Sequence, residues 1–294
     1  MIAGRLAIPV LLRAQHLAPL RYDDCPPLLA YQKTKPRVPT MGGLIVLAAA
    51  VGVAAAAGGL SHRDGWMILA AALSLGAIGW ADDLFKTRGP NGRGFRSLPK
   101  LALALAVGGA IGMMIAPVAG VALLLWLPFA MLVVAGSSHA VNLSDGMDGL
   151  AAGCTAIALA ALGILNSANH VVAIWCASVS GACAGFLWFN SFPATIYLGD
   201  VGAMALGGII GTVALLSRQP LWLAVIGGVF VLEAVSVMLQ VASYQWRNKR
   251  RVFRVAPIHH HVHLGGLPEP KVIVRFWIAG MLLAAVGLAR AGHP

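Results

Sequence analysis

Residues 199–216 read GDVGAMALGGIIGTVALL, a run of small and apolar residues that opens with a single aspartate. No charged residue follows Asp200 within this run, and its glycines and alanines suit helices that pack closely in lipid. A stretch of about 20 mainly apolar residues is long enough to cross a bilayer as a helix. The run therefore predicts a transmembrane helix with a carboxylate at one end.

The rest of the chain has the same character. Of its 294 residues, 59% are hydrophobic and 11% are charged, with a mean hydropathy of +0.82, whereas soluble domains have about 45–50% and about 25%. Hydropathy predicts nine spans, at 41–60, 66–81, 101–119, 121–139, 149–165, 171–189, 201–216, 221–243 and 272–289. We expect an all-α polytopic bundle, with residues 1–294 forming one integral membrane domain.

The amino terminus leaves one alternative open. Residues 2–12 are apolar, but as a helix they would reach only about 17 Å, against a hydrocarbon core of about 30 Å. A short tenth span within residues 1–20 is the alternative to a non-spanning segment.

The basic residues orient the spans. Sixteen lysines and arginines fall in 13–40, 82–100 and 244–271, whereas the opposite side has three, Arg63, Arg218 and Arg290. Because cytoplasmic loops carry the excess of Lys and Arg, the loops at about 82–100, 140–149, 190–200 and 244–271 are expected in the cytoplasm. The net charge of +11 then reflects this bias and attraction to anionic lipid, and nucleic acid is not an expected partner.

Six of the ten acidic residues fall on the same side as the basic loops, together with four of the nine histidines. Charged groups at the ends of several spans are expected where a soluble, charged substrate meets a component held in lipid. The acidic residues are Asp82, Asp83, Asp145, Asp148, Asp200 and Glu269.

Three aspartate motifs carry most of this charge. In GWADDLFK (79–86), two adjacent carboxylates end the second span, either as a solvated helix end or as a pair that repels and shifts a pKa. In NLSDGMDGLAAG (142–153), two Asp-Gly pairs are typical of turns whose backbone N–H groups can hold a ligand. Asp200 could cap the following helix or bind a hard cation such as Mg²⁺.

The histidines lie in RVAPIHHHVHLGG (254–266). Three consecutive histidines point in different directions on any regular backbone, so they are not arranged as a tetrahedral zinc site. Imidazoles beside Arg250, Arg251 and Arg254 could instead donate hydrogen bonds to phosphate groups.

The motifs VPTMGG, ADDLFK, NLSDGMDGLA, FNSFPATIYLGDVG and APIHHHVHLGGLPEPKVIVRFW occur in order between about residues 33 and 289. Together they resemble the polyprenyl-phosphate N-acetylhexosamine-1-phosphate transferases of glycosyltransferase family 4. Within that superfamily, PIHHH and VIVRFW are most similar to the branch that transfers phospho-N-acetylmuramoyl-pentapeptide.

The resemblance implies a reaction in peptidoglycan synthesis at the bacterial cytoplasmic membrane. Phospho-N-acetylmuramoyl-pentapeptide would pass from UDP to undecaprenyl phosphate, with Mg²⁺ required, to give lipid I and UMP. The resemblance also allows a homodimer. A related transferase of UDP-N-acetylglucosamine is the nearer alternative, and a transporter of nucleotide sugars or lipid-linked sugars is the alternative from another class.

The resemblance also implies residue roles. Asp200 would be the magnesium ligand, and Asp82 and Asp83 would lie near the lipid phosphate, with one of them a base; these three and His259 are the expected catalytic residues. The expected substrate-binding residues are Lys100, Asn142, Asp145, Gly146, Met147, Asp148, Asn190, Tyr197, His260 and His261. The chain departs from the family pattern at Ala104, His139, Ala203, Val262 and His263.

Overall fold

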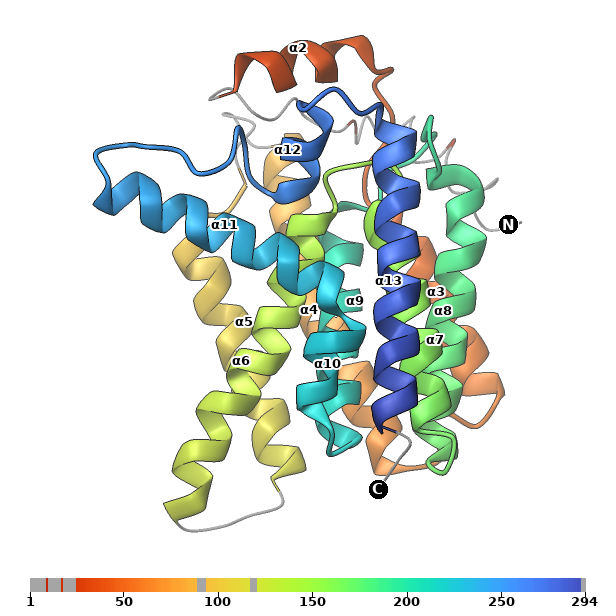
Figure 1. Ribbon diagram of the computed structural model, residues 1–294. Helices are drawn as coiled ribbons and strands as arrows, with labels where there is room; N and C mark the ends of the chain where they lie inside the picture. Colours follow the sequence, from red (N-terminus) through yellow and green to blue (C-terminus); the bar gives the residue numbers. More distant parts are fainter. Residues whose placement is uncertain (1–8, 10–16, 18–24, 89–93, 117–120, 292–294) are drawn as a thin grey trace.

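The computed structural model describes residues 9, 17, 25–88, 94–116 and 121–291, which form an elongated bundle of helices (Figure 1). Among these residues there is no β-strand, only an isolated bridge between Leu17 and Pro39. The all-α prediction is therefore confirmed. The helices are α2 (Pro26–Thr34), α3 (Gly43–Ala56), α4 (Arg63–Arg88), α5 (Ser97–Ile115), α6 (Val121–Ser144), α7 (Leu150–Leu165), α8 (His170–Asn190), α9 (Gly199–Leu216), α10 (Pro220–Ile226), α11 (Gly228–Trp246), α12 (Ile258–His263) and α13 (Glu269–Ala291).

Seven of the described helices are long and apolar enough to cross a membrane, namely α4, α5, α6, α8, α9, α11 and α13. Helices α3 and α7 are apolar but have only 14 and 16 residues, so each is shorter than the roughly 30 Å hydrocarbon core. The chain is thus a multi-pass membrane protein, and the count of nine spans stays a prediction. The proposed tenth span falls in residues 1–20, of which the structure describes only Pro9 and Leu17.

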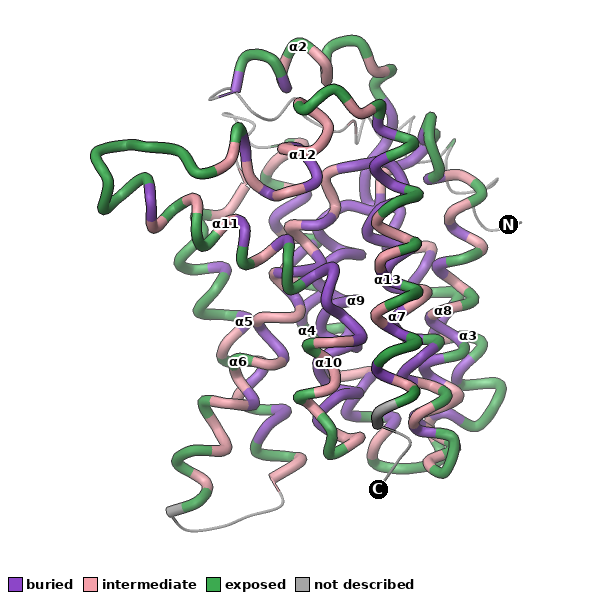
Figure 2. The backbone as a smooth tube through the Cα atoms, in the orientation of Figure 1, coloured by how far each residue is buried: buried purple, intermediate pink, exposed green. Residues whose placement is uncertain are grey.

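Helix α9, the small-residue run, lies at the centre of the bundle. Every residue from Gly199 to Leu215 is buried (Figure 2), and both α4 and α6 pack extensively against the helix. Its small residues let the neighbours approach closely: a Cβ added to Gly79 of α4 would lie 2.2 Å from the carbonyl oxygen of Asp200. The close packing expected from the sequence is present, and it fixes the position of the Asp200 backbone.

Helix α4 is longer than expected. It continues five residues beyond Asp83 to Arg88, so the aspartate pair lies inside the helix rather than at its end. Acidic residues near a helix C-terminus are disfavoured by the helix dipole. The Lys86 ammonium, one turn later and 2.7 Å from Asp82 Oδ2, offsets this cost.

The predicted span 221–243 is interrupted at Gly227. Helix α10 ends at Ile226, and α11 starts at Gly228 and leaves the bundle obliquely (Figure 1). A pair of glycines is a common cause of such a break. The consequence is that Glu233 lies in the second turn of a tilted helix and not in the middle of a straight span.

One end of the bundle collects the segments that carried the polar motifs. Helices α2 and α12 lie across this end (Figure 1). The C-terminal ends of α4, α6 and α8 and the N-terminal ends of α5, α9 and α13 meet beneath them. We refer to this region as the α2/α12 end.

Candidate active site

Two aspartates and two lysines from three helices form a buried cluster at the α2/α12 end. Asp82 lies in α4 and Asp200 in the first turn of α9, and both side chains are almost fully buried. Lys86 Nζ lies 2.7 Å from Asp82 Oδ2 and 2.8 Å from Asp200 Oδ2. Lys100 Nζ lies 3.0 Å from Asp82 Oδ2 and also contacts Asp200 Oδ2. The charges of the four side chains balance.

Asp83 points to the same region but is held differently. Its Oδ2 accepts a hydrogen bond of 3.1 Å from the backbone N–H of Val201, whereas Asp82 Oδ1 accepts one from the N–H of Phe95. The adjacent carboxylates therefore have different partners, one at the start of α9 and one in the segment before α5. This gives each aspartate a defined direction in a site that excludes most water.

The cluster suits a cation that prefers oxygen ligands. One oxygen of Asp82 and one of Asp200 contact the same two ammonium groups, so the two carboxylates are close enough to share a single cation. No group of three or more His, Cys, Asp or Glu with metal-binding geometry occurs in the described part of the chain. Mg²⁺ commonly uses only one or two carboxylates and completes its shell with water and phosphate, so the donor set fits that ion.

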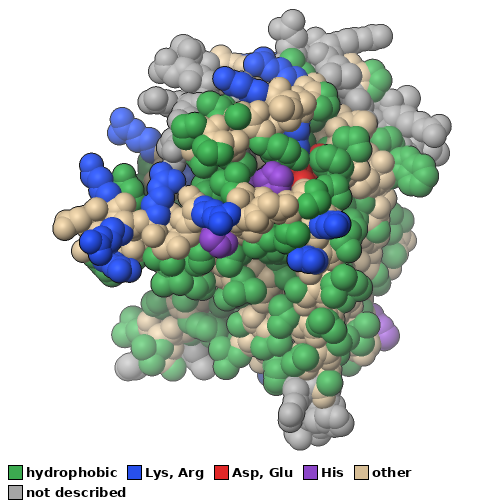
Figure 3. Space-filling model, turned by 45° about the horizontal axis from the view of Figure 1, so that its top comes forward, with side chains coloured by type: hydrophobic (Ala, Val, Ile, Leu, Met, Phe, Trp, Pro, Cys, Tyr) green, Lys and Arg blue, Asp and Glu red, His purple; other side chains and the backbone are tan. Residues whose placement is uncertain are grey.

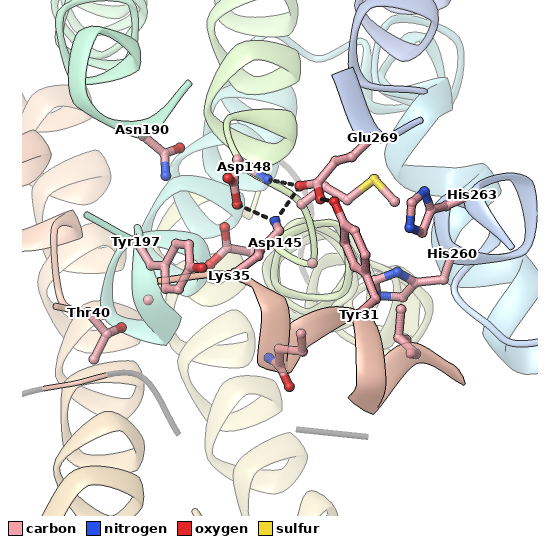
Figure 4. Close-up of a pocket in the computed structure, with 15 residues that line it drawn as sticks. Tyr31, Lys35, Thr40, Asp145, Asp148, Asn190, Tyr197, His260, His263 and Glu269 are labelled. Atoms are coloured by element: carbon pink, nitrogen blue, oxygen red, sulfur yellow. Dashed lines mark hydrogen bonds and ion pairs between the residues drawn. The ribbon is translucent and has the colours of Figure 1, made fainter. Parts of the chain in front are cut away.

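A cavity lies beside this cluster (Figure 4). The two adjoin at Gly199, which lines the cavity and whose added Cβ would lie 2.7 Å from Asp83 Oδ2. Gly199 has a φ of +75°, a left-handed conformation that favours glycine. The lining residues are Leu28, Tyr31, Gln32, Lys35, Thr40, Asp145, Gly146, Met147, Asp148, Asn190, Tyr197, Gly199, His260, His263 and Glu269.

A polar network connects four segments at the cavity wall, and Figure 4 shows the side chains of Tyr31, Lys35, Asp148 and Glu269 that take part in it. Lys35 Nζ lies 2.8 Å from Asp148 Oδ1 and 2.7 Å from Glu269 Oε1. The Tyr31 hydroxyl donates to Glu269 Oε2 at 2.7 Å, and the Asp148 N–H donates to Glu269 Oε1 at 3.0 Å. The other Asp148 oxygen accepts from the N–H of Ala194 at 3.0 Å. This network positions α2 over the turn that contains Asp145 and Asp148.

Burial shifts the acid–base properties of the cavity wall. Burial raises the pKa of Asp148, although Lys35 opposes the shift. The pKa of the Tyr31 hydroxyl is also raised, first by burial and then by its hydrogen bond to Glu269. Burial and the neighbouring histidines hold the pKa of His260 well below its usual value. At neutral pH this imidazole is therefore uncharged and can offer either a hydrogen-bond donor or an acceptor.

The four histidines have four different environments. His260 and His263 line the cavity, and His263 packs against the Tyr31 ring with 4.5 Å between ring centroids. His259 is completely buried, with its Nδ1 3.0 Å from Glu233 Oε2. His261 turns away, and its Nδ1 accepts the N–H of Arg254 at 3.1 Å. The expected divergence of the consecutive rings is present only in part, because the His259 and His260 rings lie together with 4.0 Å between their centroids, whereas His261 contacts Arg254.

The structure brings most of the predicted site residues together. Asp82, Asp83, Asp200 and Lys100 form or adjoin the carboxylate–lysine cluster, and Asp145, Gly146, Met147, Asp148, Asn190, Tyr197 and His260 line the cavity. Asn142, His259 and His261 do not line it. Asn190 has a structural task as well, because its amide donates to the Ile196 carbonyl oxygen at 2.9 Å.

Eight cavity residues were not among the predicted site residues: Leu28, Tyr31, Gln32, Lys35, Thr40, Gly199, His263 and Glu269. Lys35 and Glu269 are 234 positions apart in the chain, so no local pattern connects them. The only available signal was the expected placement of Glu269 and Lys35 on the same membrane face.

The arginines that were expected to accompany the histidines do not reach the cavity. None of Arg250, Arg251 and Arg254 lines the cavity, and all three are exposed. Figure 3 shows Lys and Arg side chains gathered around this face, with a histidine and a carboxylate visible between them. Positive charge is therefore present on this exposed face, whereas Lys35 and Lys86 are half-buried and Lys100 is buried.

The chain is similar to known proteins over most of its length. Residues 65–218, just over half of the chain, match the family described as Glycosyl transferase family 4. The chain is 38% identical over 288 residues to the phospho-N-acetylmuramoyl-pentapeptide-transferase of Thermodesulfovibrio yellowstonii (strain ATCC 51303 / DSM 11347 / YP87). That match covers 86% of this chain and 80% of the relative.

Proposed function

Because the chain belongs to glycosyl transferase family 4 and is a membrane-bound transferase, we propose that it transfers phospho-N-acetylmuramoyl-pentapeptide from UDP to undecaprenyl phosphate. The products are lipid I and UMP, in peptidoglycan synthesis. The relative's name supports this choice of transferred group. The site is proposed to face the cytoplasm of a bacterial cell, because the basic loops lie at the α2/α12 end.

One observation carries the proposal most strongly. A buried pair of carboxylates with two lysines directly adjoins a polar cavity, and the two regions meet at Gly199. Phosphoryl transfer depends mainly on positioning and on stabilisation of charge. A cavity for the nucleoside beside cations for the diphosphate provides both.

Different residues would contact different parts of the two substrates. Tyr197 and the turn from Asp145 to Asp148 form the cavity wall where the uridine would bind, and Lys86 and Lys100 would approach the phosphates. Asp82 and Asp83 would face the lipid phosphate, where one of them could accept a proton at a carboxylate oxygen. Mg²⁺, held by Asp200 with Asp82 nearby, would supply charge that stabilises the diphosphate.

The direct test is release of UMP by the purified protein in detergent. We expect release that requires both undecaprenyl phosphate and Mg²⁺, because the lipid phosphate is the attacking group and the diphosphate needs a counterion. UMP formation without lipid acceptor would indicate a hydrolase. If sugar nucleotide is never cleaved but crosses the membrane of proteoliposomes, the protein is a transporter and the proposal is wrong.

A further inference from the structure

Glu233 is a completely buried carboxylate in α11, outside the cluster and the cavity described above. Its side chain has no exposed surface, although α11 is one of the helices able to cross a membrane. An ionisable residue in such a helix is costly and usually marks a functional contact with a defined partner. No described residue makes a hydrogen bond of regular geometry with either of its carboxylate oxygens, and the ion-pair partner that the structure places beside it is His259.

The His259 ring stands between Glu233 and the cavity wall. Its Nδ1 lies 3.0 Å from Glu233 Oε2, and this ring is also completely buried. On the other side, a Cβ added to Gly146 would lie 2.4 Å from His259 Nε2 and 2.9 Å from His260 Nε2. The ring centroids of His259 and His260 are 4.0 Å apart. His259 therefore touches two cavity residues without lining the cavity itself.

A carboxylate that faces one imidazole nitrogen fixes the orientation of the ring and of its second nitrogen. Here both groups are shielded from water, so salt and solvent screen their attraction only weakly. The contact thus connects α11 to α12 and, through the Nε2 edge, to Gly146. Rotation of the His259 ring would remove support from both Gly146 and His260.

We propose that Glu233 is a positioning residue that acts through His259 to hold the turn from Asp145 to Asp148 and the His260 ring at the nucleotide cavity. The inference rests on the proposed function, since it takes the cavity to bind the sugar nucleotide. It assigns His259 a supporting role in place of the expected catalytic one. Binding of the sugar nucleotide should depend on Glu233, and binding of the lipid acceptor should not.

Two substitutions separate positioning from packing. Glu233→Gln keeps an oxygen that can accept the Nδ1–H, whereas Glu233→Met keeps the volume but removes the polar group. We expect Glu233→Met to raise the KM for the sugar nucleotide roughly 10-fold to 100-fold, as loss of an orienting partner commonly does, and Glu233→Gln to have a smaller effect. A packing role would give the opposite order, because replacing a buried charge with an apolar residue of similar size is often neutral or stabilising.

Ser236→Ala is the matched control. Ser236 is buried in the same helix, and its hydroxyl donates to the backbone carbonyl of Glu233 at 2.7 Å and not to the Glu233 side chain or to His259. This variant should keep the wild-type KM for both substrates.

A double-mutant cycle tests whether Glu233 acts through His259. In protein that already carries His259→Ala, adding Glu233→Met should change the KM for the sugar nucleotide by no more than about twofold. A change of this size lies within the usual scatter of additivity. If each single substitution raises this KM and the two increases multiply in the double variant, the inference is overturned. An unchanged KM in Glu233→Met, or an equal rise in the KM for the lipid acceptor, would also overturn it.

A spectroscopic arm distinguishes this inference from the proposed function. In protein labelled with ¹⁵N-histidine, the His259 resonances are assigned as those that disappear in His259→Ala. They should show a protonated Nδ1 in the wild type, and their chemical shifts should change in Glu233→Met. If the wild-type protein releases no UMP, the proposed function is wrong, and this spectrum alone decides whether the pair exists. An identical His259 spectrum in wild type and Glu233→Met would overturn the pairing even if the enzyme is active.

Discussion

Asp200 lies where the carboxylate–lysine cluster meets the cavity. Its carboxylate contacts Lys86 and Lys100, and the preceding residue, Gly199, lines the cavity. Its place at the start of a small-residue helix could be predicted from the sequence, because the residues that follow it up to Leu216 carry no charge. Its partners could not be predicted, because α4 and α5 reach it from more than 95 positions away.

Asp200→Asn should remove nearly all UMP release, by about 100-fold or more in kcat, while the protein still inserts and folds. The amide keeps the shape of the side chain but loses the charge that opposes a cation. The kinetics of UMP release and the melting temperature of the variant provide the check.

Asp64→Asn is the control for this substitution. Asp64 lies at the opposite end of α4, where it accepts a hydrogen bond of 2.8 Å from Asn169. It should keep wild-type activity. Substantial activity in Asp200→Asn would remove Asp200 from the cation site.

The lowered pKa of His260 predicts that acid destabilises the folded protein. The folded state holds this imidazole neutral, so the unfolded chain binds more protons once the pH falls below the ordinary value of about 6.5. Stability is therefore present above about 6.5 and is lost as the pH falls toward the folded-state pKa, by up to about 1.4 kcal/mol per pH unit. The raised pKa of Asp148 has the opposite effect, because it makes the folded protein more stable as the pH falls. This effect is confined to the range between its raised pKa and its ordinary value of 3.8.

Thermal unfolding of wild type and His260→Asn between about pH 7.5 and about pH 5.5 isolates this contribution, because the asparagine does not titrate. The wild-type melting temperature should fall further than that of the variant. Parallel curves would show that His260 is not held neutral.

At the level of elements, hydropathy was sufficient to find the helices but not how they end. The extension of α4 to Arg88, the break before α11 and the short helix α12 all escaped prediction. At each of these places a residue also contacts a distant segment: Asp82 contacts Lys100, Gly228 lies close to Leu283, and His259 contacts Glu233. Such contacts lie beyond any local pattern.

The close packing of α4 on α9 can be tested with one methyl group. Gly79→Ala would place a Cβ 2.2 Å from the Asp200 carbonyl oxygen, so the helices must separate, at a cost of about 1–3 kcal/mol for an overpacked contact. Both the melting temperature and UMP release should fall, because Asp200 moves with α9.

Gly181→Ala in α8 is the matched substitution, since an added Cβ there meets nothing within 4 Å. It should be neutral or slightly stabilising, because alanine favours a helix more than glycine does. Equal effects of the two alanines would contradict the packing described for α4 and α9.

At the scale of the whole molecule, composition predicted a membrane protein and the distribution of basic residues predicted its orientation. The meeting of six helix ends at one face followed from counting spans, and the structure shows these ends together (Figure 1). The cavity itself could not be foreseen, because α2 contributes Tyr31 and Lys35 to it from outside the predicted spans.

Orientation can be measured with single cysteines and a membrane-impermeant maleimide, since the four native cysteines are buried. Ser61 and Gln245 are both exposed, the first between α3 and α4 and the second near the end of α11. In intact cells Ser61→Cys should be labelled, and Gln245→Cys only after the membrane is opened. The reverse pattern would place the α2/α12 end outside the cytoplasm.

The cavity and the adjoining carboxylate cluster are proposed to bind UDP-N-acetylmuramoyl-pentapeptide and not UDP-N-acetylglucosamine. UMP release by the same protein preparation from each of the two sugar nucleotides separately, with undecaprenyl phosphate and Mg²⁺, decides between them. We predict turnover of the muramoyl-pentapeptide substrate and little or none of the other. Equal turnover of both, or turnover of UDP-N-acetylglucosamine alone, would contradict the account.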